Sequence, residues 1–182
     1  MTEEQIIESV LKGRTSKFAL IIRRYGEAIR SFVRRTIRQR QDAEEVAQDV
    51  FVKAFQRLDS YDAEKGSMKS WLLGIAFREV LMWLRKNQRQ AIPLEPDNLH
   101  EDTTDEEADR LLAEVKEQRI QALQEAIRQL SHEDQMLLQL YYMEDLPLKE
   151  IASVAGHDDL YLANRLHRIR KRLCTIIKKI ER

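Results

Sequence analysis

Cysteine, proline and glycine are all scarce in this chain of 182 residues, which has one, three and five of them. The single cysteine, Cys174, excludes a disulfide within the chain and any zinc site built on several cysteines. The four histidines, His100, His132, His157 and His167, are scattered, and none forms the i, i+4 pair of a helical metal site. We therefore expect no metal and no cofactor.

Motifs of covalent catalysis are also missing. The sequence has no glycine-rich phosphate loop, no cluster of metal ligands and no nucleophile elbow. Cys174 lies in a basic segment, where a thiol can become reactive. A buried structural thiol is the commoner fate of a free cysteine, and we favour it here. We therefore expect a protein that is not an enzyme.

Long apolar runs are absent too. No run approaches the roughly 20 residues that a membrane-spanning helix needs. The first residues, MTEEQIIESVLKG, are acidic and poor in apolar side chains, which is not the pattern of a signal peptide. We expect a cytoplasmic protein without membrane insertion. Because helix breakers are few and 34% of the residues are charged, the predicted fold class is all-α.

The net charge is zero, but the charges are unevenly distributed along the chain. Residues 1–92 carry 18 basic and 12 acidic side chains, residues 93–117 carry 2 and 10, and residues 118–182 carry 11 and 9. These counts give net charges of +6, −8 and +2. Pro93 and Pro96 interrupt the helical pattern in the acidic segment. We predict two small helical domains, 1–92 and 118–182, joined by a flexible acidic linker, 93–117.

Local signals predict where several helices begin and end. Thr2 and Gln5 form a capping box for a first short helix, which ends at Gly13. Thr104 and Glu107 offer a second capping box, for a helix that continues to about residue 130. Ser131 caps the helix that follows.

The segment Asp42–Leu58 is predicted to be a helix that Asp42 caps. Acidic and amide side chains fill its first half. The predicted buried apolar stripe of this helix is Val46, Val50, Phe51, Ala54, Phe55 and Leu58. By itself, an acidic first turn is more often solvated surface that complements the helix dipole. The alternative is a docking face for an arginine-rich partner. The candidate docking residues are Asp42, Glu44, Glu45, Val46, Gln48, Asp49 and Phe51.

The next predicted helix begins at Ser67 or Ser70 and combines aromatic with basic side chains. Aromatic rings stack on unpaired bases for about 1–3 kcal/mol each, while nearby cations hold the phosphates. The loop before it could accept an extruded base, although a turn without function fits its composition equally well. Trp71 is interpreted as a core or partly buried residue. The candidate nucleic-acid residues are Tyr61, Lys65, Lys69, Trp71, Arg78, Trp83, Arg85 and Lys86.

Residues 148–173 have the pattern of a helix-turn-helix. Gly156 allows the sharp turn, and Leu160, Leu162 and Leu166 are predicted to seat the second helix. Its outward side would enter the major groove, where arginine and asparagine make base-edge contacts. An ordinary amphipathic helix with a basic face is the alternative. The outward candidates are Tyr161, Asn164, Arg165, Arg168 and Lys171.

These segments together resemble the extracytoplasmic-function (ECF) group of bacterial sigma factors. DAEEVAQDVFVKAF resembles the group's segment that binds core RNA polymerase. SWLLGIAFREVLMWLRK resembles its helix that reads the minus-ten element, and the segment from LQEAIRQL to RLHRIRKRL resembles its region that reads the minus-thirty-five element. The resemblance covers roughly residues 15–90 and 118–178. It implies a dissociable factor that binds core RNA polymerase and promoter DNA and promotes strand opening, with an anti-sigma factor as a further partner.

The resemblance also implies roles for individual residues. The docking residues of the acidic helix would face the clamp helices of the polymerase. The loop from Ser60 to Ser70 would hold a flipped minus-ten base, and the linker would thread through the polymerase. Along the non-template strand the resemblance places Arg78, Trp83, Arg85 and Lys86, and at the minus-thirty-five duplex it places Lys149, Arg165, Arg168 and Lys171.

A plain helix-turn-helix regulator is the competing interpretation. Such a regulator would bind duplex DNA without polymerase, and it would have no need for the acidic helix paired with the aromatic one. The recognition helix itself begins with Asp158 and Asp159. Two carboxylates at this place suit the helix dipole but repel phosphate.

Overall fold

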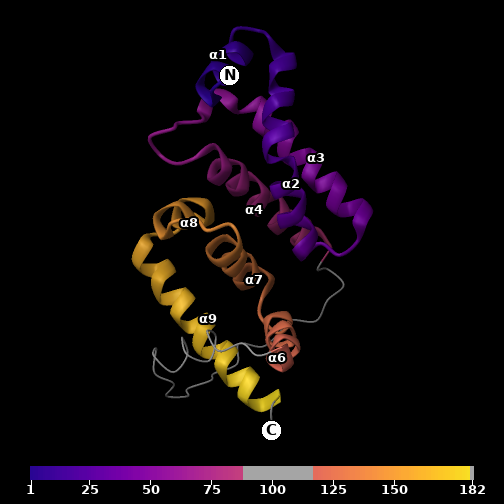
Figure 1. Ribbon diagram of the computed structural model, residues 1–182, viewed down its shortest axis with the longest axis vertical. Helices are drawn as coiled ribbons and strands as arrows, with labels where there is room; N and C mark the ends of the chain where they lie inside the picture. Colours follow the sequence, from indigo (N-terminus) through magenta and orange to yellow (C-terminus); the bar gives the residue numbers. More distant parts are fainter. Residues whose placement is uncertain (88–116, 181–182) are drawn as a thin grey trace. The chain divides into compact units, whose positions relative to one another are not determined.

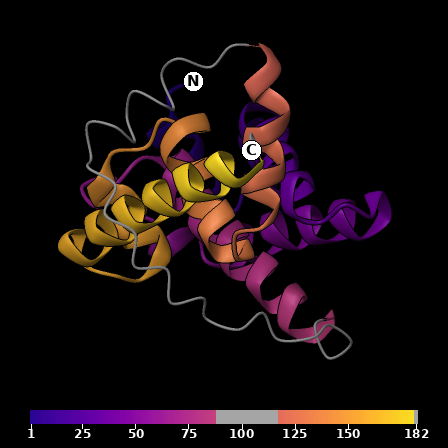
Figure 2. The same ribbon diagram turned by 90° about the horizontal axis from the view of Figure 1, so that it is seen from below.

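The computed structural model describes residues 1–87 and 117–180 (Figures 1 and 2). The described residues form helices and turns without a strand, which confirms the all-α prediction. No described helix is long and apolar enough to cross a membrane. The predicted capping box of Thr104 and Glu107 and most of the predicted linker lie outside these ranges.

The chain divides into two compact units, which are described separately. The first comprises Met1–Ala91, and the second comprises Ile92–Ala152 and His157–Arg182; the division places Ser153–Gly156 with the first. We call them the N-terminal and the C-terminal unit, and we describe residues 148–156 together with the C-terminal unit, because most of the helix that they form belongs to it.

The N-terminal unit is built from four α-helices and two short 3₁₀ turns. Helices α2, α3 and α4 pack against one another and α1 packs on α2, as Figure 1 shows. Ile29, Phe32 and Val50 are completely buried between them. The elements are α1 (Glu3–Leu11), η1 (Thr15–Lys17), α2 (Phe18–Thr36), α3 (Arg40–Gln56), η2 (Leu58–Ser60) and α4 (Met68–Asn87).

Most predicted helix ends in this unit are confirmed. The Thr2 hydroxyl accepts a hydrogen bond from the Gln5 backbone N–H, and the Gln5 side chain accepts one from the Thr2 backbone N–H. Gly13 takes a left-handed φ of 89° just after α1. The Ser67 hydroxyl accepts a bond of 3.2 Å from the Ser70 N–H at the start of α4. These ends depend on side chains within three residues, so local sequence was enough to find them.

The predicted cap at Asp42 is wrong. Helix α3 begins at Arg40, and its N-cap residue is Gln39, whose side chain makes no capping bond. The first helical bond runs from the Ala43 N–H to the Gln39 carbonyl at 3.0 Å. Asp42 therefore lies inside the first turn, where its carboxylate still complements the helix dipole.

The C-terminal unit packs its helices around the long α9, which is yellow in Figure 2. Met136, Leu140, Ile151 and Leu162 are completely buried. Cys174 is also fully buried, which confirms its interpretation as a structural thiol. The elements are α6 (Glu117–Arg128), α7 (His132–Leu138), the π-helical η4 (Gln139–Met143), α8 (Leu148–Ala155) and α9 (Asp159–Ile180).

Helix caps and turns shape this unit as well. The Ser131 hydroxyl accepts a bond of 3.2 Å from the Asp134 N–H, so the predicted cap of α7 is confirmed. After η4 the chain reverses through Asp145, whose φ of 55° is left-handed. Gly156, with a φ of 74°, forms the turn between α8 and α9. This is the predicted helix-turn-helix arrangement.

Candidate functional site

The exposed face of α3 carries the predicted docking carboxylates. Glu45, Gln48 and Asp49 are exposed, and Asp42 and Glu44 are half-buried. Glu44 also lies 4.0 Å from the Arg34 guanidinium of α2. The first half of α3 therefore presents a polar, mainly negative surface.

Two residues of the predicted docking set do not lie on this surface. Val46 and Phe51 are only 6% and 8% exposed, so they offer a partner little contact area. They belong to the inward stripe of α3 together with Val50 and Ala54. Their burial agrees with the predicted apolar stripe, which also included them, and leaves little of either side chain for the predicted docking role.

An apolar groove between α2 and α3 exposes other side chains instead. It has a volume of about 630 Å³, and Phe18, Ile22 and Val52 line it together with Phe55. Val52 is 53% exposed and Phe55 is 41% exposed, although Phe55 was predicted in the buried stripe. The Phe55 ring packs edge to face on Phe18, with 5.2 Å between ring centroids.

Sequence reasoning missed this groove. Ile22 and Val52 lie at the edges of the apolar stripes of α2 and α3, and periodicity alone does not say whether an edge position is covered. The polar residues Arg30, Glu44 and Gln48 also line the groove. The groove therefore joins exposed apolar area to the acidic face of α3.

A second groove brings two predicted sets of residues together. It lies between α3 and α4 and has a volume of about 370 Å³. Asp42, Glu45 and Asp49 line it from α3, and Trp83 and Lys86 line it from α4. The docking carboxylates and part of the nucleic-acid set are therefore neighbours, which the sequence did not indicate.

One ion pair joins the two helices at this groove. Lys53 Nζ of α3 lies 2.5 Å from Glu79 Oε2 of α4, and both residues also line the groove. The Glu79 side chain is only 11% exposed. The pair therefore links the helix that carries the carboxylates to the helix that carries the aromatic and basic residues.

The remaining nucleic-acid candidates on α4 lie on a different side of that helix. Trp71, Arg78 and Arg85 follow one another at seven-residue spacing, so at 100° per residue each is offset by about 20° from the one before it and the three share one side within about 40°. Arg78 and Arg85 are exposed, and Trp71 is half-buried, as predicted. The predicted nucleic-acid residues of α4 thus include one row, formed by Trp71, Arg78 and Arg85, and a second group, Trp83 and Lys86, which lines the groove between α3 and α4.

The loop between η2 and α4 is held by its own contacts. The Tyr61 ring packs edge to face on Trp71 with 5.5 Å between centroids, and its hydroxyl donates to the Gly66 carbonyl at 3.3 Å. Asp62 accepts from the Glu64 N–H at 3.0 Å and pairs with Lys65 at 3.2 Å. These interactions, the backbone bond first, lower the pKa of Asp62.

Charge remains available on this loop. The Lys65 side chain is 82% exposed despite its pair with Asp62, and Lys69, in the first turn of α4 just after the loop, is half-buried. The loop whose Tyr61 ring packs on Trp71 therefore also carries an exposed ammonium group. An unpaired base and its phosphate would find ring surface and positive charge together at such a place.

The start of the recognition helix is a carboxylate cap. Asp158 Oδ1 accepts a bond of 2.7 Å from the Tyr161 N–H, so this carboxylate is engaged by the helix itself. The Tyr161 ring lies against His157, with 4.3 Å between centroids. Leu162 and Leu166 seat the helix as predicted. Leu160 does not: it is 71% exposed, since it lies in the first turn and faces away from the core.

Arg165 is the clearest correction to the predicted duplex-facing set. Its Nε donates to Asp134 Oδ1 at 2.8 Å, and its Nη1 donates to Glu133 Oε1 at 3.0 Å. The side chain is only 16% exposed. Burial alone would lower the pKa of Arg165, but the hydrogen bonds and charges of the two carboxylates outweigh it and raise the pKa.

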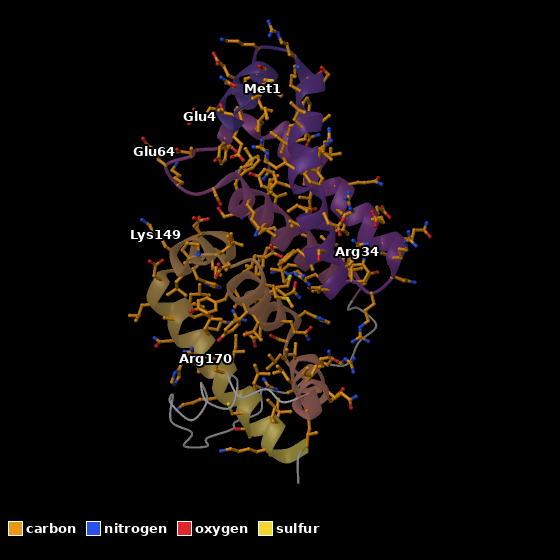
Figure 3. The ribbon with its side chains drawn as sticks, in the orientation of Figure 1. Met1, Glu4, Arg34, Glu64, Lys149 and Arg170 are labelled. Atoms are coloured by element: carbon orange, nitrogen blue, oxygen red, sulfur yellow. The ribbon has the colours of Figure 1, made fainter. Side chains whose placement is uncertain are left out.

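The other members of that set keep an outward position. Tyr161, Asn164 and Arg168 are exposed on α9, and Lys171 is half-buried further along it. Lys149 is exposed on α8, where Figure 3 labels it. Among residues 1–87 and 117–180 no group of three or more His, Cys, Asp or Glu side chains could hold a metal ion.

The chain is similar in sequence to known sigma factors of RNA polymerase. The family described as Sigma-70 region 2 matches residues 21–90. The RNA polymerase sigma-H factor of Pseudomonas aeruginosa is 27% identical over 160 residues, which cover 84% of this chain and 81% of the relative. The ECF RNA polymerase sigma-E factor of Escherichia coli K12 is 25% identical over 179 residues, covering 94% and 92%.

Solved structures agree on the fold. CnrH, solved in complex with the cytosolic domain of CnrY, superposes with a TM-score of 0.64 at 20% identity, covering 96% of both chains. The sigma factor RpoE of Bartonella quintana, solved with the anti-sigma factor NepR, gives 0.63 at 21% identity, covering 88% of this chain and 96% of that one. The chain is therefore a sigma factor of the sigma-70 type. Within that class it belongs to the ECF group, whose members act in transcription initiation.

Proposed function

We propose that this chain binds core RNA polymerase, recognises minus-ten and minus-thirty-five promoter elements, and promotes strand opening without catalysing covalent chemistry itself. The observation that carries the proposal is the region 2 match over residues 21–90, because α3, α4 and most of α2 of the N-terminal unit fall within it. The helix-turn-helix of the C-terminal unit supplies a second DNA-binding element, which a factor that reads two promoter elements requires.

The polymerase-docking surface in this proposal is the exposed face of α3. Glu45, Gln48 and Asp49 would receive basic and amide side chains of the polymerase, since exposed carboxylates pair best with arginine. Val52 and Phe55 would supply the apolar part of the contact, because they are exposed where Val46 and Phe51 are buried. A docking site of this kind combines an apolar centre with a polar rim.

The strand-opening surface combines the loop and α4. Tyr61 and Trp71 would stack on or beside unpaired bases of the minus-ten element, and Lys65 and Lys69 would hold the phosphates. Arg78 and Arg85 continue the row that starts at Trp71, which supports a path for one strand along that side of α4.

The C-terminal unit would read the minus-thirty-five duplex with α9. Tyr161, Asn164 and Arg168 are exposed and would approach base edges, while Lys171 and Lys149 would contact phosphate. The Asp158 carboxylate already caps the helix, so its negative charge is partly compensated before DNA arrives.

The division into domains 1–92 and 118–182 with an acidic linker, 93–117, remains part of the proposal. We also propose an anti-sigma factor as a regulatory partner. Two solved structures of similar fold are complexes: CnrH is bound to the cytosolic domain of CnrY, and the sigma factor RpoE is bound to the anti-sigma factor NepR. An anti-sigma factor that covers the exposed apolar groove of α2 and α3 would block polymerase docking directly.

Reconstituted transcription tests the function. The protein is mixed with core polymerase and genomic DNA, and the run-off transcripts are sequenced. Discrete start sites that share an upstream motif and depend on the protein are expected. If transcripts do not depend on it while the free protein binds duplex DNA, the helix-turn-helix regulator becomes the better interpretation.

A further inference from the structure

Arg165 occupies an unusual place on the recognition helix. At 100° per residue, Tyr161, Asn164, Arg168 and Lys171 fall within an arc of about 80°, and Arg165 lies about 40° beyond the edge of that arc. A side chain as long as arginine could reach DNA from such a position. Instead, its guanidinium turns toward α7 and is largely buried.

The contacts of Arg165 join two helices that are distant in the sequence. Its two hydrogen bonds end on Glu133 and Asp134, which lie 32 and 31 residues earlier in the first turn of α7. Both carboxylates are partly buried, with side-chain exposures of 34% and 17%. A planar guanidinium that meets two acceptors fixes direction as well as distance, which a lysine would not do.

The carboxylates also face the start of the recognition helix. His157 Nε2 lies 4.0 Å from Glu133 Oε1, and the His157 ring packs on Tyr161. One cluster therefore connects the first turn of α7, the turn before α9 and the first two turns of α9. Its centre is the set of Arg165, Glu133 and Asp134, which we call the Arg165 bracket.

We propose that the Arg165 bracket is a specificity device: it fixes the orientation of the recognition helix and keeps one positive charge away from the DNA. This inference rests on the proposed reading of duplex DNA by α9. Arg165 is then a positioning residue, and the contacts are made by Tyr161, Asn164 and Arg168. A free arginine beside the reading face would add phosphate affinity to every sequence, and this lowers discrimination.

Two variants of the full-length chain separate this role from direct DNA contact. In Arg165→Gln the guanidinium is lost. In the double variant Glu133→Gln, Asp134→Asn the guanidinium is kept but its acceptors lose their charge. Binding is measured by fluorescence anisotropy on a duplex taken upstream of a mapped start site and on a scrambled duplex, between about 50 and 200 mM salt.

The bracket predicts that the two variants differ in the salt dependence of binding to the scrambled duplex. The double variant should steepen the salt dependence by about 0.9 in log K against log salt, since one released arginine adds one phosphate contact. Arg165→Gln should leave that slope at the wild-type value. Both variants should lose about tenfold in preference for the upstream duplex, as expected when a base contact is misplaced. Arg165→Lys should recover part of this preference.

The matched control changes the charge without touching the bracket. Glu125→Gln, Asp145→Asn also removes two negative charges and releases Arg128, which pairs with Glu125 on α6. If the double variant behaves like this control, the bracket is refuted. A slope that becomes shallower by about 0.9 in Arg165→Gln also refutes it, since Arg165 would then touch phosphate itself.

Folding and function are controlled separately. Melting curves from circular dichroism show whether a variant is folded. If the double variant does not fold, the single variants Glu133→Gln and Asp134→Asn are used in its place, because each of them keeps one charged acceptor for Arg165. If the wild-type chain shows no preference for the upstream duplex, the proposed reading by α9 fails. The slopes on the scrambled duplex still decide whether Arg165 is held away from phosphate.

Discussion

The ion pair between Lys53 and Glu79 should contribute measurably to the stability of the N-terminal unit. The Nζ to Oε2 distance is 2.5 Å, and the two side chains are 34% and 11% exposed. Exposed pairs contribute about 0–1 kcal/mol, whereas loss of one partner of a fully buried pair costs about 3–5 kcal/mol. With one partner buried and the other partly solvated, we expect Glu79→Gln to cost about 2 kcal/mol, close to the value of a hydrogen bond to a charged group.

The expected loss can be measured in two ways. For a unit of this size, about 2 kcal/mol lowers the melting temperature by roughly 8–16 °C. A double-mutant cycle in urea with Lys53→Met and Glu79→Gln isolates the coupling between the two side chains. Lys12 and Glu8 form the same kind of pair at the surface of α1, with exposures of 70% and 64%, so Glu8→Gln is the matched control and should change nothing measurable.

The result that would refute this reasoning is a coupling below about 0.5 kcal/mol, the value of an exposed pair. Solvent would then screen the Lys53–Glu79 pair as effectively as it screens a surface pair. Burial of Glu79 in the groove between α3 and α4 would in that case not be the cause of any stabilisation.

Three further predictions address other parts of the chain. Val52→Asp should weaken binding to core polymerase at least tenfold in a competition assay while leaving the melting temperature unchanged, because Val52 is 53% exposed; unchanged affinity would exclude it from the docking surface. Asp145→Val should lower the free energy of unfolding in urea by about 1–2 kcal/mol, since a β-branched residue disfavours a φ of 55°, whereas Asp145→Gly should not lower it. Burial and the Glu3 carboxylate raise the pKa of Tyr25 to about 12, so its contribution to stability is complete below about pH 10 and is lost as the pH rises to 12. Ultraviolet titration should show a tyrosine transition near pH 12, and Glu3→Gln should move that transition to lower pH; a wild-type titration without a transition near pH 12 would contradict this assignment.

Helix ends and the turn of the helix-turn-helix could be predicted because their causes are local. A cap at Thr2 or Ser131 depends on a backbone group three residues away. A left-handed turn at Gly156 depends on the missing side chain of that residue. The failure at Asp42 has the same origin: the helix starts two residues earlier without a capping side chain, and no local signal marks such a start.

Exposure of individual side chains could be predicted only in part. The inward stripe of α3 was found from its period, and Val46 and Phe51 are buried as that stripe predicts, but Phe55 at its edge is exposed. Periodicity gives the direction of a side chain from the helix axis. It does not tell how far the neighbouring helix extends over that side chain, which is decided when α2, α3 and α4 pack together.

By itself, the sequence determined the all-α class, the order of the helices, the helix-turn-helix and the resemblance to ECF sigma factors, since each of these depends on residue types at short spacing. The tertiary structure decided which side chains meet. It placed the carboxylates of α3 in one groove with Trp83 and Lys86. It also joined Arg165 to acceptors 31 and 32 residues away, so its guanidinium is not free on the outward side of α9. Contacts over such separations depend on how helices cross, and no local pattern in the chain records that angle.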